Sequence, residues 1–361
     1  MVNPLEQDLN HILAHTEGLW DELRGKRVFI TGGTGFFGCW LLESFAWAND
    51  QLGLHASAWV LTRDPGAFRQ KAPHLANHPA IRFHVGDVRS FEFPVSEFSH
   101  IIHAATEASA TLNEEKPLLM FDTIVEGTRH TLEFARQRGA KKFLVTSSGA
   151  VYGKQPPDMA YLPEEYTGGP DPLDPRSAYG EGKRAAETLC TLYARQFGLE
   201  TKVARGFAFV GPYLPLDLHF AIGNFIRDGL CGGPIQVNGD GTPYRSYLYA
   251  ADMAIWLWTI LFKGESCRPY NVGSEESLSM AELAHAVAQA FTPLADVQIA
   301  KTAVPGKAAE RYVPSVQRAE HELGLRPVVG LSDSIERTVA GHRKLMAKLL
   351  IADKSANHEQ A

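Results

Sequence analysis

The sequence predicts an α/β fold in which a doubly wound parallel sheet is joined to a smaller C-terminal α/β lobe. Short apolar runs mostly alternate with stretches long enough for a helix, a glycine-rich turn directly follows the first run, and the length of 361 residues exceeds that of a typical single domain. The strand-length runs begin at residues 27, 56, 81, 100, 142 and 201. Strands that alternate with helices form a parallel sheet covered on both faces, so we expect a Rossmann-type first domain.

The chain is expected to divide into four parts. Apolar residues recur at loosely helical spacing near the start, which predicts a leader helix within residues 1–25. The Rossmann domain follows over 26–211. Glycine and proline then punctuate shorter elements, which predicts a substrate lobe over 212–350 with some strands or helices returning to the first domain. The polar stretch 351–361 is expected to be a flexible tail.

Charge and composition disfavour several classes of partner. The chain has 35 Lys and Arg against 41 Asp and Glu, a net charge of −6 without any block of like charges, which argues against nucleic acid and anionic membranes. The longest apolar run, Met253 to Phe262, is about half of the roughly 20 residues that a membrane span needs, so we expect a buried helix. The N-terminus lacks the features of a secretory signal, which favours a cytoplasmic location. The four cysteines lack metal-binding spacing, and no metal site is expected.

A glycine-rich turn, Thr31-Gly-Gly-Thr-Gly-Phe-Phe-Gly38, lies between the first strand and a helical pattern. Gly32 and Gly35 permit a tight turn and the approach of backbone N–H groups to a pyrophosphate, and Gly38 lets the helix lie close to the strand. Such a motif is weak evidence alone, but its place after the first strand of a βαβ chain indicates a dinucleotide site. The alternative is a glycine-rich turn without a ligand.

The end of the second strand bears on the choice of cofactor. Thr62 and Arg63 stand where an NAD-binding chain usually carries a carboxylate for the ribose 2′-OH. A guanidinium suits a 2′-phosphate, so we favour NADP over NAD. The alternative is a solvated Arg63 that stacks on adenine and tolerates either cofactor. Asp87, after the third strand, is expected to accept a hydrogen bond from the adenine amino group, or else to cap the strand end.

Three side chains suggest alcohol oxidation. Tyr179 and Lys183 are four residues apart on a predicted helix and therefore share one face. A cation beside a phenol lowers the pKa of the phenol, as a base that removes an alcohol proton requires. Ser148 ends another predicted strand, where open α/β sheets bind ligands, and its hydroxyl can bond the same substrate oxygen.

Together these motifs resemble the extended short-chain dehydrogenase/reductase superfamily, and within it the NAD-dependent epimerase/dehydratase family that modifies nucleotide sugars. The likeness covers roughly residues 26–345 and rests on TGGTGFFG, GDV, HAAT, SSGAVYG, PRSAYGEGK, the pair Asn224-Phe225 and NVG. It implies that Tyr179 is the general base or acid, that Lys183 activates it and binds the nicotinamide ribose, and that Ser148 contacts the substrate oxygen. It also implies cofactor contacts for other residues of these motifs, namely Phe36, Phe37, Val88, Ala104 and Ala105.

The same likeness implies that the second lobe holds the nucleoside diphosphate of a nucleotide sugar. Asn224, Arg245 and Arg311 match diphosphate-binding positions, and two arginines with an amide donor suit a pyrophosphate. A surface ion pair is the alternative for each arginine taken alone. The likeness further implies a homodimer built from the helices near 115–138 and 177–197.

Departures from the family pattern bear on the reaction. Gly149 and Ala150 stand where relatives that dehydrate or decarboxylate carry acidic side chains. We therefore expect hydride transfer at sugar C4 alone, either in epimerisation or in reduction of a 4-keto sugar. Three alternatives stay open: a dehydratase or decarboxylase in which Glu107 faces the sugar as a displaced acid, a reductase of small ketones, and a non-catalytic NADP-binding sensor. His219 is either a wall of the sugar pocket or an interfacial histidine.

Overall fold

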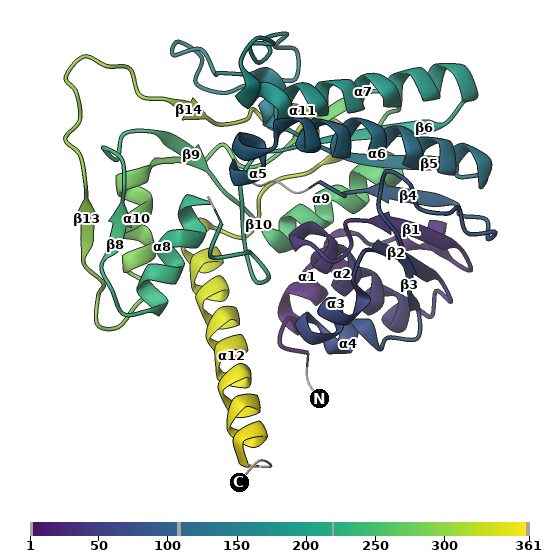
Figure 1. Ribbon diagram of the computed structural model, residues 1–361, viewed down its shortest axis with the longest axis horizontal. Coiled ribbons are helices and arrows are strands. Elements are labelled where there is room, and N and C mark those ends of the chain that lie inside the picture. Colours follow the sequence, from purple (N-terminus) through teal and green to yellow (C-terminus); the bar gives the residue numbers. More distant parts are fainter. Residues whose placement is uncertain (1–2, 107–109, 219, 359–361) are drawn as a thin grey trace.

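The computed structural model describes residues 3–106, 110–218 and 220–358. Its main feature is a sheet of seven parallel strands in the order β11-β6-β5-β4-β1-β2-β3. The strands are β1 (Arg27–Thr31), β2 (Ser57–Thr62), β3 (Ile81–Val85), β4 (His100–His103), β5 (Lys142–Ser148), β6 (Glu200–Gly206) and β11 (Pro269–Val272). The doubly wound parallel sheet expected from the alternating pattern is confirmed (Figure 1).

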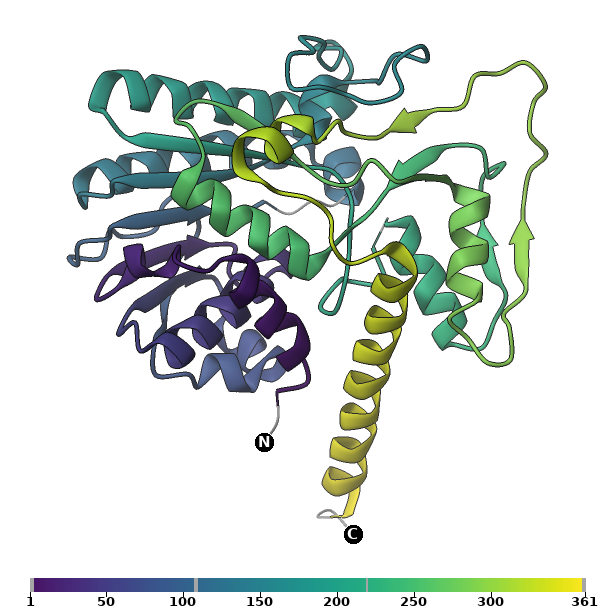
Figure 2. The same cartoon turned by 180° about the vertical axis from the view of Figure 1, so that it is seen from behind.

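Helices cover both faces of this sheet (Figures 1 and 2). One face carries α1 (Glu6–His15), α2 (Phe36–Leu52), α3 (Pro65–Lys71), α4 (Pro73–Ala76), α9 (Ala250–Lys263) and α11 (Gln317–Leu323). The other carries α6 (Pro117–Gln137) and α7 (Ala178–Phe197), preceded by α5 (Ala110–Glu115). Three short 3-10 turns, η1 (Trp20–Leu23), η2 (Gly149–Tyr152) and η3 (Pro175–Ser177), connect these elements.

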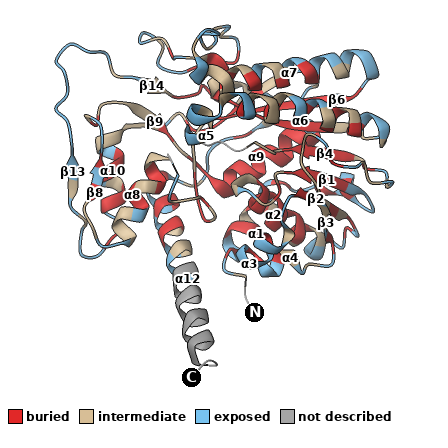
Figure 3. Ribbon diagram, in the orientation of Figure 1, coloured by how far each residue is buried: buried red, intermediate tan, exposed pale blue. Residues whose placement is uncertain are grey.

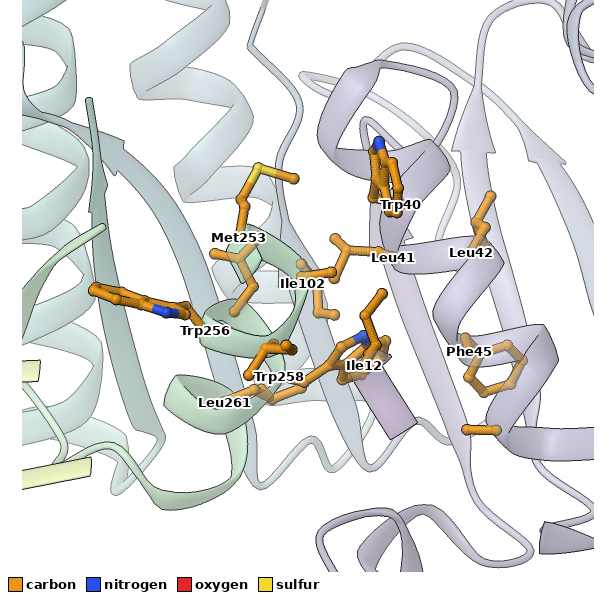
Figure 4. Packing of buried hydrophobic residues seen from close by; sticks show 14 of the residues in the cluster. Ile12, Trp40, Leu41, Leu42, Phe45, Ile102, Met253, Trp256, Trp258 and Leu261 are labelled. Atoms are coloured by element: carbon orange, nitrogen blue, oxygen red, sulfur yellow. The ribbon is translucent and has the colours of Figure 1, made fainter. Parts of the chain in front are cut away.

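The larger hydrophobic core lies between the sheet and the α1, α2 and α9 layer (Figures 3 and 4). Trp258 of α9 packs on Trp20 with ring centroids 4.8 Å apart, and its indole N–H donates to Ser44 Oγ at 2.8 Å. A buried indole needs such a partner, so α9 is held in one orientation. Every residue from Ala250 to Phe262 is buried, as expected for the apolar run. Within the described ranges, no helix combines the length and the apolarity required to cross a bilayer.

A smaller lobe, built around a separate core, adjoins the carboxyl ends of the strands (Figure 1). It contains α8 (Ala221–Leu230), α10 (Met280–Ala288) and the pair β8 (Ile235–Val237) and β13 (Val297–Ile299). A three-stranded sheet has the order β12-β9-β14, from β12 (Ser277–Ser279), β9 (Tyr244–Ser246) and β14 (Arg311–Tyr312). The short pair β7 (Phe209–Val210) and β10 (Leu248–Tyr249) lies at the junction.

Some of the chain after residue 212 belongs to the first lobe. Helix α9 packs on its core, and β11 pairs with β6 at the edge of its sheet. The last helix, α12 (Leu331–His358), begins in the small lobe and extends away from the body (Figure 2). The stretch expected to be a flexible tail is therefore helical as far as His358.

The strand order creates a crevice at one end of the sheet. Strand β1 lies between β4 and β2, so the chain winds outward in opposite directions from the β1/β4 boundary. Ligands of open α/β sheets bind at the carboxyl ends of the strands at such a point. The glycine turn follows β1, and the HAAT segment begins with the last residue of β4, so both lie at this crevice.

Candidate active site

The glycine turn is closely packed at three of its positions, against backbone atoms at two of them and against a side chain at the third. Gly32 has a φ of +70°, and a Cβ atom there would lie 2.4 Å from the carbonyl oxygen of Ala104. A Cβ atom on Gly38 would lie 2.3 Å from the backbone of Gly33, and one on Gly33 would lie 2.6 Å from Val60. Only a residue without Cβ fits at Gly32 and Gly38, because the backbone atoms that they face cannot rotate away, whereas Gly33 is limited by the Val60 side chain.

Gly35 differs from the other glycines of the turn. It is the N-cap residue of α2, its φ is −79°, and a Cβ atom there would approach only the carbonyl oxygen of Gly32, at an ordinary 3.4 Å. No side chain caps the N-terminus of α2. The N–H of Gly35 bonds the carbonyl oxygen of Gly32, and the N–H groups of the first turn of α2 are left without a side-chain cap, so this cradle of N–H groups fits the pyrophosphate of a dinucleotide.

Two residues considered for binding the adenosine half of the cofactor, Arg63 and Asp87, follow the ends of β2 and β3. Arg63 is exposed. Asp64, the carboxylate next to it in the sequence, caps α3 by accepting a hydrogen bond from the N–H of Ala67. Asp87 is bound by Arg89, whose Nε lies 2.9 Å from Asp87 Oδ1, and the bonds from Arg89 lower the pKa of Asp87. The Asp87 carboxylate also accepts a hydrogen bond from the backbone N–H of Arg89 at 3.0 Å, as the alternative of a cap at the strand end requires.

A buried histidine ties the HAAT segment to β1. His103 Nδ1 lies 2.9 Å from Thr31 Oγ1, and His103 Nε2 lies 3.1 Å from Thr128 Oγ1. Burial lowers the pKa of His103 to about 3, so the ring is neutral. Thr128 donates its own proton to a backbone carbonyl and Thr31 accepts from the N–H of Ala105, so His103 donates from Nε2 and accepts at Nδ1. The network fixes the segment that follows β4.

Tyr179 and Lys183 share one face of α7, as their spacing predicts. Lys183 Nζ lies 5.8 Å from the centroid of the Tyr179 ring and donates to Thr106 Oγ1 at 2.8 Å and to the carbonyl oxygen of Thr146 at 2.7 Å. Burial lowers the pKa of Lys183 to about 7. Burial also raises the pKa of Tyr179, and a hydrogen bond with Ser148 opposes this rise. The structure thus brings the three proposed catalytic residues together beside the segment after β4.

A fourth side chain, which the sequence reasoning missed, completes this cluster. The phenol oxygen of Tyr312 lies 3.5 Å from Ser148 Oγ. Its ring packs on Phe207, with centroids 4.7 Å apart. A Cβ atom on Gly149 would lie 2.7 Å from both the Tyr312 oxygen and the Phe207 ring, so these two side chains fill the space beside Gly149. The sequence offered one signal for Tyr312, which is its position directly after Arg311, a residue already proposed for the substrate site.

The two arginines proposed for the diphosphate lie on opposite faces of the β9/β14 pair. The register aligns Arg245 with Tyr312 and Arg311 with Tyr244. Successive residues of a strand point to opposite faces, so Arg245 shares a face with Tyr312 while Arg311 does not. The contacts agree, since the Arg245 guanidinium lies 5.7 Å from the Tyr312 ring centroid and that of Arg311 4.3 Å from the Tyr244 ring centroid. Arg245 therefore lies on the face of Tyr312 and the triad, and the shared binding of a diphosphate by both arginines stays a prediction.

Asn224 lies beside a cavity in the small lobe. The cavity has a volume of about 500 Å³, and its polar lining includes Asn224, Arg227, Asp228, Gln236 and Asn238. Asn224 Oδ1 accepts a hydrogen bond from Arg227 Nη1 at 3.3 Å, so the Asn224 oxygen, and not its amide nitrogen, faces Arg227. Neither Arg245 nor Arg311 lines this cavity.

A larger cavity of about 610 Å³ lies on the opposite side of α7 from Tyr179 and Lys183. Its principal charged groups are already paired, because Arg205 and Glu187 form an ion pair of 2.7 Å. No member of the triad lines it. Glu107 and His219, two residues considered for the sugar site, lie outside the described residues.

Comparisons with known proteins agree with the fold. The model of the NAD dependent epimerase/dehydratase family matches residues 28–273. Among curated proteins, UDP-glucuronic acid decarboxylase 5 of Arabidopsis thaliana is 32% identical over 312 residues, which cover 86% of this chain and 87% of the relative. UDP-glucuronic acid decarboxylase 1 of Xenopus tropicalis is 29% identical over 319 residues, covering 88% and 72% of the two chains.

Two solved structures of more than 25% identity show the same fold. The dTDP-glucose 4,6-dehydratase of Streptomyces venezuelae, solved with NAD bound, has a TM-score of 0.74 and 26% identity, covering 88% of this chain and 97% of the other. The UDP-glucose 4-epimerase of Thermus thermophilus, in complex with NAD, has a TM-score of 0.72 and 28% identity, covering 88% and 99%. The relatives therefore carry out several different reactions on one fold.

Proposed function

This chain belongs to the NAD-dependent epimerase/dehydratase family, and from this premise we propose that it catalyses hydride transfer at C4 of a nucleoside-diphosphate sugar. The observation that carries the proposal is the meeting of Ser148, Tyr179 and Lys183 at the carboxyl end of β5, beside the segment that follows β4. These side chains supply a base, a cation and a hydroxyl donor, which alcohol oxidation requires. The glycine turn faces the same crevice and leaves room for a pyrophosphate.

Each residue of the triad has a separate task in this reaction. Tyr179 accepts the proton of the sugar C4 hydroxyl, and Ser148 donates a hydrogen bond to the same oxygen. Lys183, held by Thr106 and Thr146, presents its charge toward the Tyr179 ring and favours the phenolate. A nicotinamide cofactor, when bound at the glycine turn, would supply the hydride acceptor for this reaction.

The surroundings of Ser148 favour hydride transfer without elimination. Position 149 has no side chain, and Tyr312 and Phe207 fill the adjacent space. In the described part of the chain, no carboxylate is hydrogen-bonded to the triad. Removing a proton from sugar C5 requires such a base, so we favour C4 epimerisation or reduction of a 4-keto sugar.

Decarboxylation of a nucleotide uronic acid is the second candidate, and the similarity to UDP-glucuronic acid decarboxylases favours it. Oxidation at C4 turns a uronate into a β-keto acid. Its C5–carboxylate bond then breaks with loss of carbon dioxide, and the electron pair passes to the C4 carbonyl oxygen, where Tyr179 and Ser148 donate hydrogen bonds. This step needs no carboxylate base, so the residues at 149 and 150 do not oppose it.

One experiment separates these outcomes. The purified protein is incubated with NAD or NADP and with UDP-glucose, dTDP-glucose or UDP-glucuronic acid, and the products are identified by mass spectrometry and chromatography. We expect an isomer of unchanged mass from a neutral sugar nucleotide. Loss of carbon dioxide from UDP-glucuronic acid would establish the second candidate instead. Absence of turnover with these substrates and with their 4-keto forms would overturn the proposal.

Arg245 is expected to contribute more to substrate binding than Arg311. Because Arg245 lies on the face toward the triad, Arg245→Ala should weaken binding of the nucleotide sugar about tenfold to a hundredfold, the usual value of a charge-assisted contact to phosphate. Arg311→Ala is the matched control and should change affinity by less than about threefold. Calorimetric titration with the nucleoside diphosphate measures both. Equal losses in the two variants would show that both arginines reach the ligand despite the register.

Arg63 is the feature that favours NADP, whereas the two solved relatives described above contain NAD. If Arg63 binds a 2′-phosphate, Arg63→Ala should weaken NADP binding about tenfold and leave NAD binding unchanged. Binding titrations of both cofactors to both proteins measure this. An unchanged ratio of the two affinities would assign Arg63 to the solvated role and leave NAD as the cofactor.

We also propose that the protein forms a homodimer through α6 and α7. Both helices expose large apolar side chains, which are Leu118, Leu119, Leu192 and Phe197. Exposed apolar side chains near the start of α6 and near the end of α7 suit burial against a second copy. The mass in solution, measured by light scattering, tests this.

A further inference from the structure

Tyr312 touches the reacting groups without belonging to the triad. We propose that Tyr312 is a positioning residue for Ser148: its phenol donates a hydrogen bond to Ser148 Oγ, so that Ser148 directs its own proton toward Tyr179 and the sugar oxygen. This inference rests on the proposed role of Tyr179 as the base. It assigns to Tyr312 no direct contact with the substrate.

The hydrogen-bonding capacity of Ser148 decides the direction of these bonds. A serine hydroxyl has one proton and two lone pairs. One lone pair accepts the N–H of Ala150 at 3.1 Å. A base in the form that accepts a proton needs a donor beside it, so the Ser148 proton must point toward Tyr179 or the sugar oxygen. The remaining lone pair of Ser148 then faces Tyr312, which has to be the donor.

The surroundings of Tyr312 keep its phenol protonated. Burial raises the pKa of Tyr312, and the nearby Tyr179 and Tyr152 raise it further, whereas Ser148 and the Arg245 guanidinium act in the opposite direction. Lys183 lies on the same face of α7 as Tyr179, with its Nζ 5.8 Å from the centroid of the Tyr179 ring. A buried, neutral phenol can donate but does not compete for the substrate proton.

Packing holds the phenol in place. The Tyr312 ring lies on Phe207, and the missing side chain at Gly149 leaves the space that the hydroxyl occupies. The next residue, Val313, is anchored by bonds from its N–H to Gln155 Oε1 and from the N–H of Leu162 to its carbonyl oxygen, both at 2.9 Å. The distance of 3.5 Å to Ser148 is long for a hydrogen bond, and catalytic hydrogen bonds often tighten only when substrate binds.

The proposal is tested by following the ionisation of Tyr179 directly. Protein labelled with carbon-13 at the tyrosine ζ position is titrated by NMR with NAD bound, and the Tyr179 signal is assigned from its absence in Tyr179→Phe. Without Tyr312 the Ser148 hydroxyl is a poorer donor to the phenolate, so in Tyr312→Phe the Tyr179 midpoint should rise by about half a pH unit or more.

Tyr152→Phe is the matched control. Tyr152 is another buried phenol packed near Phe207, but it donates to Asn271 Oδ1 at 2.7 Å and accepts from Arg205. Its removal should lower stability without moving the Tyr179 midpoint. No change in Tyr312→Phe, or an equal change in both variants, overturns the positioning role.

This titration requires no substrate, so its outcome is separate from that of the activity screen. If the Tyr179 midpoint shifts in Tyr312→Phe but the protein turns over no nucleotide sugar, the role of Tyr312 is supported and the proposed reaction is rejected. Where turnover is found, the acid limb of the kcat profile should move upward by the same amount in Tyr312→Phe, with the KM for the sugar nucleotide unchanged.

Discussion

Replacing Tyr179 by phenylalanine is expected to lower kcat about a thousandfold, because positioned acid–base groups typically contribute a hundredfold to ten-thousandfold. The phenyl ring preserves the shape of the site, and Lys183 keeps its bonds to Thr106 and Thr146. The affinities for NAD and for the nucleotide sugar should therefore change little. Absorbance of the reduced nicotinamide in single-turnover experiments measures the rate, and calorimetry measures both affinities.

Tyr193→Phe controls for the loss of a phenol from the same helix. Tyr193 lies further along α7, where its hydroxyl makes a 3.4 Å contact with Glu133 on α6. Its removal should leave kcat unchanged. A rate for Tyr179→Phe within tenfold of that of the unaltered protein would remove Tyr179 from the role of base and favour the non-catalytic alternative.

Much of the first lobe could be predicted from the sequence because its pattern is local. Strand-length apolar runs and intervening helices alternate regularly up to β6, and six of the seven strands of the main sheet were expected on that basis. Strand β11 was not expected as a sheet strand from its pattern, because Pro269–Val272 is too short to show a period. It forms through pairing with β6, which lies far away in sequence, and such pairing overrides local preference.

The site could be predicted where a single helix carries the residues. It could be predicted less well where the register between two strands decides which side chains share a face. Tyr179 and Lys183 share a face because helical geometry fixes positions four apart. Arg245 and Arg311 lie on strands of three and two residues, whose pairing no local signal specifies. A shift of one residue exchanges the faces of a strand, so sequence reasoning combined two arginines that the register separates and overlooked Tyr312.

Single substitutions of glycine by alanine in the glycine turn can distinguish the glycines that folding requires from those that ligand binding requires. Gly38→Ala should destabilise the protein by about 3 kcal/mol, because the new Cβ atom would lie 2.3 Å from the backbone of Gly33, and backbone overlap cannot be relieved by rotating a side chain. Denaturant unfolding measures this loss. Comparable stability of Gly38→Ala and the unaltered protein would contradict the close packing of α2 on the turn.

Gly35→Ala should behave in the opposite way. Its Cβ atom meets only an ordinary contact of 3.4 Å, so the free energy of unfolding should change by less than about 1 kcal/mol. The methyl group would nevertheless project into the cradle of N–H groups at the start of α2, and NAD binding should weaken about tenfold or more. Because the folded protein requires no glycine at this position, a loss of affinity without a loss of stability would assign Gly35 to the pyrophosphate. Unchanged NAD affinity in a stable Gly35→Ala protein would mean that the phosphates bind at another place on the sheet. The proposed positions of the nicotinamide and of the sugar relative to Tyr179 would then be wrong as well.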